Sequence, residues 1–335
     1  MSFYDRLLPA VRNGGFSMEG NWVWCGSVIK GDDNLYHMFA TMFSKDFPFH
    51  PNWLTNSRIV RAISDKPEGP YAYVDDVLSP RGTSYWDGLM THNPTIHRSG
   101  DNYLLYYTGA TYEFDVPTRS RPDVSASEKS IVRGNQRIGL AISRDLDGPW
   151  QRFDRPVLDV RDGYWDSWMT TNPAPMVLEN GSILMLYKAT DHEKGSVKYG
   201  AASASSYDQP FVRFDDTPIF DFDFSYEDVC IWYEGGNYKM LFNDLTGKIT
   251  GEVRAGAYAT SSDGKSWSIA ESPKGYSRTV AWDDGKTSFQ GSFERPQILV
   301  ENGRATHLFS ATGDGTSSFF DAKNTWNMVT PLKQE

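Results

Sequence analysis

Carboxylate side chains recur along this 335-residue sequence just ahead of segments rich in β-forming residues. The clearest copies are Trp86-Asp87 and Trp165-Asp166, and each aspartate precedes an Asn-Pro dipeptide by six residues. Glu227-Asp228 and Glu294-Arg295 stand at comparable places before later apolar runs. These acids are therefore the first candidates for chemistry.

Two carboxyl groups in different surroundings can divide acid–base work between them. One that is held protonated donates to the leaving oxygen of a glycosidic bond, while an ionised one activates water or attacks carbon. Acids gathered at one rim would repel each other unless ligands or arginines compensate. The pattern indicates acid–base chemistry on a sugar. The alternative for Asp87 and Asp166 is structural: they cap turns while the neighbouring tryptophans pack between repeats.

Two other reactive side chains stand near the same positions. His92, beside Asn93, could donate a proton to a leaving group, but it could equally bond its own loop. Cys25 would need an adjacent base or cation to act as a nucleophile, and a buried thiol is the simpler interpretation. The sequence shows no metal-ligand spacing, phosphate-cradling glycine loop or serine elbow, so we expect no metal and no cofactor.

The elements that must position these residues follow an internal repeat. An apolar run, a turn rich in Gly, Asp or Asn, and a second run that closes on an aromatic residue occur five times. The closing aromatic residues are Phe39, Tyr107, Tyr187, Phe242 and Phe309. Further strands are expected after the hairpins, at residues 59–64, 137–143, 198–203 and 256–261. Five units of about four antiparallel strands predict an all-β, five-bladed β-propeller.

We expect a single domain over residues 1–335, with one interruption of the repeat. Residues 112–136 are polar and lack periodicity, which predicts a long insertion loop in the second blade. Such a loop is either a lid over the site or a surface excursion.

Composition excludes several classes of function. A net charge of −10 without a Lys/Arg-rich block argues against nucleic-acid binding, and no apolar stretch is long enough for a transmembrane helix. Two cysteines cannot form a disulfide framework. No signal peptide is visible at the start, so we expect a cytoplasmic protein if that start is the natural one.

The repeat and the residues at its strand starts resemble those of the five-bladed propeller glycoside hydrolases, the superfamily that includes families 43, 32, 68, 117 and 130. The resemblance extends over nearly the whole chain as a pattern, whereas the specific motifs match poorly. Those enzymes place an aspartate at the first inner strand, where this chain has Cys25, and another acid in the second blade, where it has Asn93. Either the acids have moved, or catalysis is organised differently or lost.

We assign roles on this partial match. Glu227 is expected to be the general acid, with Asp87 or Asp166 as the base and the other tuning its pKa. The residues expected to bind sugar hydroxyls or to stack on the sugar are Trp24, Trp86, His92, Asn93, Trp165, Asn172, Asp228, Glu294 and Arg295.

The expected function is hydrolysis that removes a terminal sugar from an oligosaccharide substrate. Two alternatives stay open. A glycoside phosphorylase would need a cationic cluster at the site, for which Arg295 and Lys188 are the available residues. A non-catalytic sugar-binding propeller would account for the missing first-blade aspartate.

Overall fold

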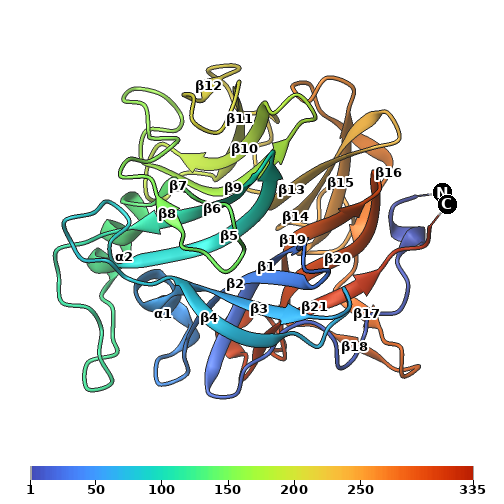
Figure 1. Cartoon of the computed structure of the whole chain (residues 1–335), viewed down its shortest axis with the longest axis horizontal. Coiled ribbons are helices and arrows are strands. Elements are labelled where there is room, and N and C mark those ends of the chain that lie inside the picture. The colour runs from blue at the N-terminus through green and yellow to red at the C-terminus, as the bar shows by residue number, and fades with distance from the viewer. Residues whose placement is uncertain (1, 335) are drawn as a thin grey trace.

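The computed structural model describes residues 2–334, and over this range five antiparallel sheets are arranged around a common centre (Figure 1). Four sheets have four strands each, ordered as in the sequence from the centre outward, and the fifth has three. This is the predicted all-β, five-bladed propeller.

The strands of the blades have the following bounds. Blade one contains β1 (Asn21–Lys30), β2 (Tyr36–Ser44), β3 (Arg58–Ser64) and β4 (Ala72–Leu78). Blade two contains β5 (Met90–Ser99), β6 (Asn102–Ala110), β7 (Arg137–Ser143) and β8 (Gln151–Arg152). Blade three contains β9 (Met169–Val177), β10 (Ile183–Thr190), β11 (Lys198–Ala204) and β12 (Val212–Arg213). Blade four contains β13 (Glu227–Glu234), β14 (Asn237–Asp244), β15 (Ala255–Ser261) and β16 (Ser268–Tyr276). Blade five contains β19 (Ser292–Glu301), β20 (Arg304–Gly313) and β21 (Thr325–Pro331).

The remaining elements are short. Helix α1 (Phe49–Asn56) connects β2 to β3, and α2 (Ala126–Gly134) lies between β6 and β7. The hairpin of β17 (Thr279–Ala281) and β18 (Thr287–Phe289) joins blades four and five. The 3₁₀ helices are η1 (Tyr4–Arg6) and η2 (Phe319–Asp321). No helix within the described range is long and apolar enough to cross a membrane.

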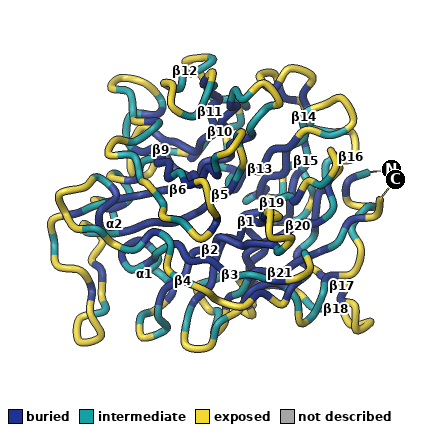
Figure 2. Tube along the Cα trace, viewed as in Figure 1, coloured by how far each residue is buried: buried dark blue, intermediate teal, exposed yellow. Residues whose placement is uncertain are grey.

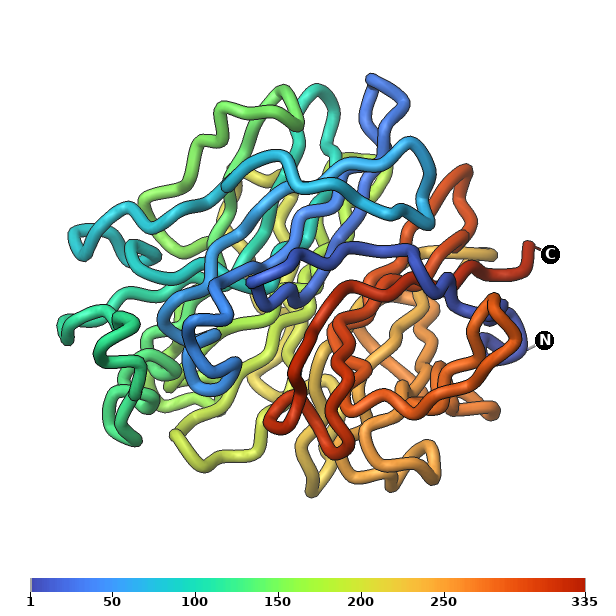
Figure 3. The backbone as a smooth tube through the Cα atoms, turned by 90° about the horizontal axis from the view of Figure 1, so that it is seen from below, coloured from blue at the N-terminus to red at the C-terminus, as the bar shows by residue number. Residues whose placement is uncertain are grey.

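The N-terminal segment closes the ring. Leu7 bridges Leu332 and Phe16 bridges Asn327, so residues 7–16 take the place of an outermost strand beside β21. The amide of Val11 also donates to the carbonyl of Val329. Figures 1 and 3 show the two chain ends close together on this side. The fifth blade is therefore completed by residues from both ends of the chain, which ties the first blade to the last.

Side-chain burial follows the radial order of the strands. The inner strands are buried along most of their length, whereas the outer strands β4 and β16 expose many residues (Figure 2). The five recurring aromatic residues lie on the second strands, and each has no measurable exposure. They contribute to apolar clusters that join neighbouring blades.

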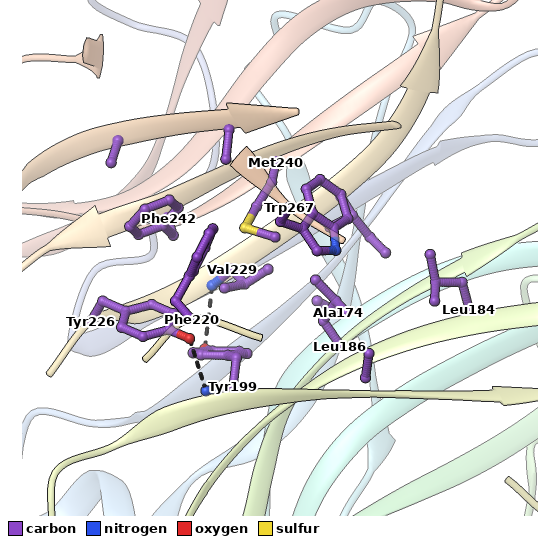
Figure 4. Packing of buried hydrophobic residues seen from close by; sticks show 14 of the residues in the cluster. Ala174, Leu184, Leu186, Tyr199, Phe220, Tyr226, Val229, Met240, Phe242 and Trp267 are labelled. Atoms are coloured by element: carbon purple, nitrogen blue, oxygen red, sulfur yellow. Dashed lines mark hydrogen bonds between the residues drawn. The ribbon is translucent and has the colours of Figure 1, made fainter. Parts of the chain in front are cut away.

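The cluster between blades three and four shows how two blades are held together (Figure 4). Phe242 of β14 packs against Tyr226, which precedes β13, with ring centroids 5.4 Å apart. The Tyr226 hydroxyl accepts from the backbone amide of Tyr199 in β11 at 3.2 Å, and the Tyr199 hydroxyl accepts from the amide of Val229 at 3.3 Å. These bonds fix β13 against blade three, because buried backbone donors require partners.

The polar segment 112–136 has more structure than expected from its sequence. It carries α2, which begins with a capping box at Ser125 and Glu128. Val132 and Tyr112 are buried in a cluster with Leu54 of α1. The insertion is therefore packed against the body of the propeller through these apolar contacts.

Candidate active site

The five inner strands share one backbone feature at the propeller axis. Each has a β-bulge, and a residue at that bulge adopts a positive φ that non-glycine residues rarely adopt. The residues and their φ angles are Cys25 (45°), Asn93 (52°), Asn172 (49°), Asp228 (59°) and Arg295 (52°). Because a bulge changes the direction of a side chain, the same backbone irregularity orients all five residues. We call them the axial ring.

Hydrogen bonds connect the axial ring across the blades. The Cys25 thiol donates to Asn93 Oδ1 at 2.7 Å, and Asn93 Nδ2 donates to Asn172 Oδ1. Asn172 Nδ2 then donates to Asp228 Oδ1 at 3.3 Å, and Arg295 Nη1 donates to the same oxygen at 3.4 Å. Asp228 therefore accepts from both sides, as an ionised carboxylate can. All five residues are at most 5% exposed.

Three of the bulges are also fixed by hydrogen bonds to the preceding blade. The amide of Asn93 donates to Thr41 Oγ1 of β2, and the amide of Asn172 donates to Thr108 Oγ1 of β6, both at 3.1 Å. The amide of Arg295 donates to the carboxylate of Asp228 at 3.1 Å. The buried donors created by the bulges are thus satisfied, and adjacent blades determine where the ring side chains lie.

Two glutamates stand one residue before the axial ring in neighbouring blades. Glu227 precedes Asp228 and forms an ion pair with Lys188 Nζ at 3.1 Å. Glu294 precedes Arg295 and forms an ion pair with Arg254 Nη1 at 3.1 Å. The Glu227 side chain is 28% exposed and that of Glu294 is 9% exposed. The two carboxyl groups therefore occupy equivalent positions in different environments.

Those environments move the two pKa values in opposite directions. Burial raises the pKa of Glu294 to about 8, and the charges of Asp228 and Glu227 add to the rise. Burial also opposes ionisation of Glu227, but the charge and hydrogen bond of Lys188 together with the charges of Arg133 and Arg254 outweigh it and lower the net pKa. At neutral pH, Glu294 is therefore mostly protonated and Glu227 is ionised. Divergent pKa values of two nearby carboxyl groups are what acid–base catalysis requires.

His92 and Asp228 complete the titratable groups predicted for the site. Burial, with the charges of Arg295 and Lys188, lowers the pKa of His92 to about 3, so its imidazole is neutral. Its Nδ1 lies 3.2 Å from Ser57 Oγ, and its ring packs on Trp53 at 5.0 Å. Burial raises the pKa of Asp228 despite the opposing charge of Arg295. A neutral imidazole is a far weaker acid than an imidazolium, which favours the alternative in which His92 makes a positioning bond.

Asp87 and Asp166 have structural partners instead of catalytic ones. Both are completely buried. Asp87 pairs with Arg81 and with Arg152 of the outermost strand β8, and it accepts from the Tyr107 hydroxyl at 2.7 Å. Asp166 has the same kind of surroundings, with two arginines and a tyrosine: Arg161, Arg213 and Tyr187. Both carboxylates are therefore engaged in ion pairs, which include Arg152 of β8 and Arg213 of β12, and the expected role of either aspartate beside Glu227 stays a prediction that these ion pairs do not favour.

The tryptophans that were expected to stack on sugars pack against protein. Trp86 stacks on Tyr107 with centroids 6.0 Å apart, and Trp165 stacks on Tyr187 at 5.8 Å. Both lie beside the two buried aspartates, as the structural alternative requires. Trp24 precedes the axial ring residue of blade one but is buried edge-on against Phe49 at 5.0 Å.

Several charged residues near the axis were not assigned from the sequence to the expected hydrolase site. Lys188 lies in β10, where every residue is buried, and a lysine in such a strand is itself a signal of a buried partner. Arg254 belongs to the loop before β15 and gives no sequence signal. Arg133 of α2 contributes to the lowered pKa of Glu227, so the insertion brings a positive charge to the site.

Two hollows lie apart from this site and share no residue with the axial ring. One of about 670 Å³ is lined by Arg6, Glu234 and Asn302 among others, and one of about 580 Å³ lies beside the N-terminal segment. Both cysteines are free and buried. Among residues 2–334, no group of three or more His, Cys, Asp or Glu side chains is arranged to hold a metal ion.

The propeller is similar to solved glycoside hydrolases. A family 117 enzyme from Zobellia galactanivorans aligns with a TM-score of 0.70 at 16% identity, covering 96% of this chain and 89% of its own. A family 32 β-fructofuranosidase from Bombyx mori aligns with a TM-score of 0.65 at 13% identity, covering 98% and 63%. A family 62 α-L-arabinofuranosidase domain from Coprinopsis cinerea aligns at 0.62 and 11%, covering 99% and 98%. The predicted resemblance to this superfamily is confirmed in the fold.

At the level of sequence, the similarity to known proteins is low. An uncharacterized protein of Mycobacterium tuberculosis is 25% identical over 256 residues, which is 73% of this chain and 75% of that protein. No protein-family model matches the chain.

Proposed function

We propose that this protein is a glycoside hydrolase that removes a terminal sugar from an oligosaccharide. The observation that carries the proposal is the pair Glu227 and Glu294, which stand at equivalent bulges of adjacent blades with pKa values moved apart. The fold shared with solved glycoside hydrolases supports it.

In the proposed mechanism, Glu294 is the general acid and protonates the leaving glycosidic oxygen. Glu227, ionised beside Lys188, acts as the base that activates water or as the nucleophile that attacks the sugar carbon. This exchanges the role expected for Glu227 from sequence, because a lowered pKa suits a base and a raised pKa suits an acid. Asn93, Asn172 and Asp228 would hold sugar hydroxyls or keep the glutamates in place.

The test combines a substrate screen with two matched variants. Aryl glycosides and oligosaccharides are screened with product analysis, and Glu227→Gln and Glu294→Gln are assayed on whichever substrate is turned over. We expect both variants to lose roughly a hundredfold or more in kcat, since general acid–base groups contribute about 10²–10⁴. Aryl glycosides with activated leaving groups should rescue Glu294→Gln, which lacks the acid, more than Glu227→Gln.

Full activity of either variant would remove that glutamate from the mechanism. The absence of an acid at Cys25 favours a second candidate, a sugar-binding propeller without catalysis. Under that reading, a sugar raises the melting temperature of the protein while no product forms from any substrate in the screen.

A further inference from the structure

Arg295 presents an unused hydrogen-bonding edge at the propeller axis. The residue is 2% exposed, and its Nη1 donates to Asp228. Its Nε and Nη2 are buried and have no hydrogen-bond partner within the part of the chain that the structure describes. A buried donor without a partner costs free energy, and two on one guanidinium are unusual in a folded protein.

The two unused groups form one side of the guanidinium plane. Nε–H and one Nη2–H point in parallel, and this fork matches the two oxygens of a carboxylate. The opposite side is already occupied by Asp228. Arg295 is therefore held by one carboxylate in an orientation that leaves the fork for a second one.

The charges around Arg295 also favour an anion. Three cations, Lys188, Arg254 and Arg295, each lie within 3.4 Å of a carboxyl oxygen, of Glu227, Glu294 and Asp228 in that order. With Glu294 protonated, these six side chains carry one net positive charge. Arg133 adds a further positive charge near Glu227.

The neutral neighbours do not compensate this charge. Burial raises the pKa of the Cys25 thiol, so it stays uncharged beside the guanidinium, and His92 is a neutral imidazole. Burial makes the imbalance costly, because an excess charge at low dielectric is stabilised mainly by a counter-charge.

We propose that the fork of Arg295 binds the carboxylate of an acidic sugar, so that the substrate class is an oligosaccharide ending in a uronic acid. The inference that the acidic sugar is a substrate rests on the proposed glycosidase function, whereas the inference that Arg295 binds it does not. A carboxylate brings one negative charge, which balances the single excess positive charge of the six side chains. It also presents two coplanar oxygens to the fork.

Inorganic phosphate is also an oxyanion that a guanidinium can bind, so it is the competing ligand for the fork of Arg295. It would convert the reaction from hydrolysis to phosphorolysis. A phosphate dianion brings one charge more than the six axial side chains lack, so it would also need Arg133 as a counter-charge, whereas a carboxylate needs the six side chains alone. The experiment separates the two.

Thermal unfolding of the full chain at pH 7 and constant ionic strength measures binding. The ligands are a panel of free uronic acids, which includes glucuronate and galacturonate, their neutral counterparts glucose and galactose, and inorganic phosphate. We expect at least one uronic acid to raise the melting temperature while its neutral counterpart does not.

The variant Arg295→Lys keeps a positive charge for Asp228 but lacks the fork. We expect it to weaken the apparent Kd of the uronic acid by about tenfold or more, as loss of charge-assisted hydrogen bonds does. The control is Arg98→Lys, because Arg98 is an exposed residue paired with Asp32. It should bind the uronic acid as the unmodified protein does.

Three results would overturn the inference. They are equal protection by neutral sugars, protection by phosphate alone, and no protection by any uronic acid in the panel. The comparison of acidic with neutral sugars uses the unmodified protein, so it decides the matter even if Arg295→Lys fails to fold. Protection by a uronic acid without hydrolysis of any aryl uronide would leave this inference standing and contradict the proposed hydrolase.

Discussion

Replacing Glu294 by glutamine should remove a pH-dependent loss of stability from the folded protein. In the native state the pKa of Glu294 is raised from 4.5 to about 8 by burial and by the nearby Asp228 and Glu227 charges. Below pH 4.5 the carboxyl group is protonated in both folded and unfolded chains, so the stability associated with it is fully present. As pH rises toward 8, only the unfolded chain releases the proton freely, and stability falls.

The magnitude follows from the interval between the two values. About 3.5 pH units at about 1.4 kcal/mol each correspond to roughly 5 kcal/mol lost by pH 8 and above, of which about 3 kcal/mol is lost by pH 7. Glutamine has the same shape but no proton to release. The difference in unfolding free energy between the original protein and Glu294→Gln should therefore decline from pH 5 to about pH 8 and level off by pH 9.

The assay is urea unfolding followed by tryptophan fluorescence at intervals across this range, for which the chain has 11 tryptophans. Glu252→Gln is the control, because hydrogen bonds to Arg278 and Ser277 and the charge of Lys274 lower the pKa of Glu252 below 4.5 against the effect of burial. Its difference from the original protein should be constant between pH 6 and pH 9. A constant difference for Glu294→Gln as well would refute the assignment of a protonated acid at the axis.

Three further predictions concern the scaffold. Asp166→Asn should lower the unfolding free energy by about 3 kcal/mol, because it removes the counter-charge of the partly buried Arg213 and one of the two counter-charges of Arg161, while the pH dependence of any turnover stays unchanged. Gly256→Ala should destabilise the protein by about 1–3 kcal/mol in chemical unfolding, because a Cβ would lie 2.2 Å from the buried ring of Tyr276. Deleting residues 2–16 should lower the melting temperature by more than 10 °C, since it removes the outer partner of β21 and uncouples the last blade, and calorimetry would detect this as a broader transition.

The sequence predicted the architecture well because each blade repeats the same local signals. Hairpin turns, alternating apolar residues and one aromatic residue per hairpin are local features, and each expected third strand is present as β3, β7, β11 or β15. The closing role of residues 7–16 was not predicted. It depends on contact between the two ends of the chain, which no local pattern encodes.

Within the site, residues at the bulges and residues farther from them differ in how well the sequence predicted their positions. Asn93, Asn172, Asp228 and Arg295 lie together at the axis because matched repeat positions coincide there, while their expected contact with a sugar stays a prediction. Asp87 also occupies a matched position, but its side chain pairs with Arg81 of the same loop and with Arg152 of β8, the outermost strand of the same blade. The pairing with Arg152 depends on how the strands of the blade assemble, so the carboxylate could not be assigned to the axis or to the outer strand from sequence alone.

The bulge that all five inner strands share affects how the chemistry at the axis of this fold can vary. Because every blade uses the same backbone device, a substitution at a ring position changes the chemistry of the axis without requiring a new strand geometry. In this chain blades one to three supply a thiol and two amides, which are uncharged, and blades four and five supply the charged pair Asp228 and Arg295. The charged groups are therefore confined to one side of the axis, where both glutamates also stand. If the site binds a sugar as proposed, the uncharged side would form hydrogen bonds with hydroxyls and the charged side would supply acid, base and counter-charge, so an occupant should be polar on one edge and anionic on the other.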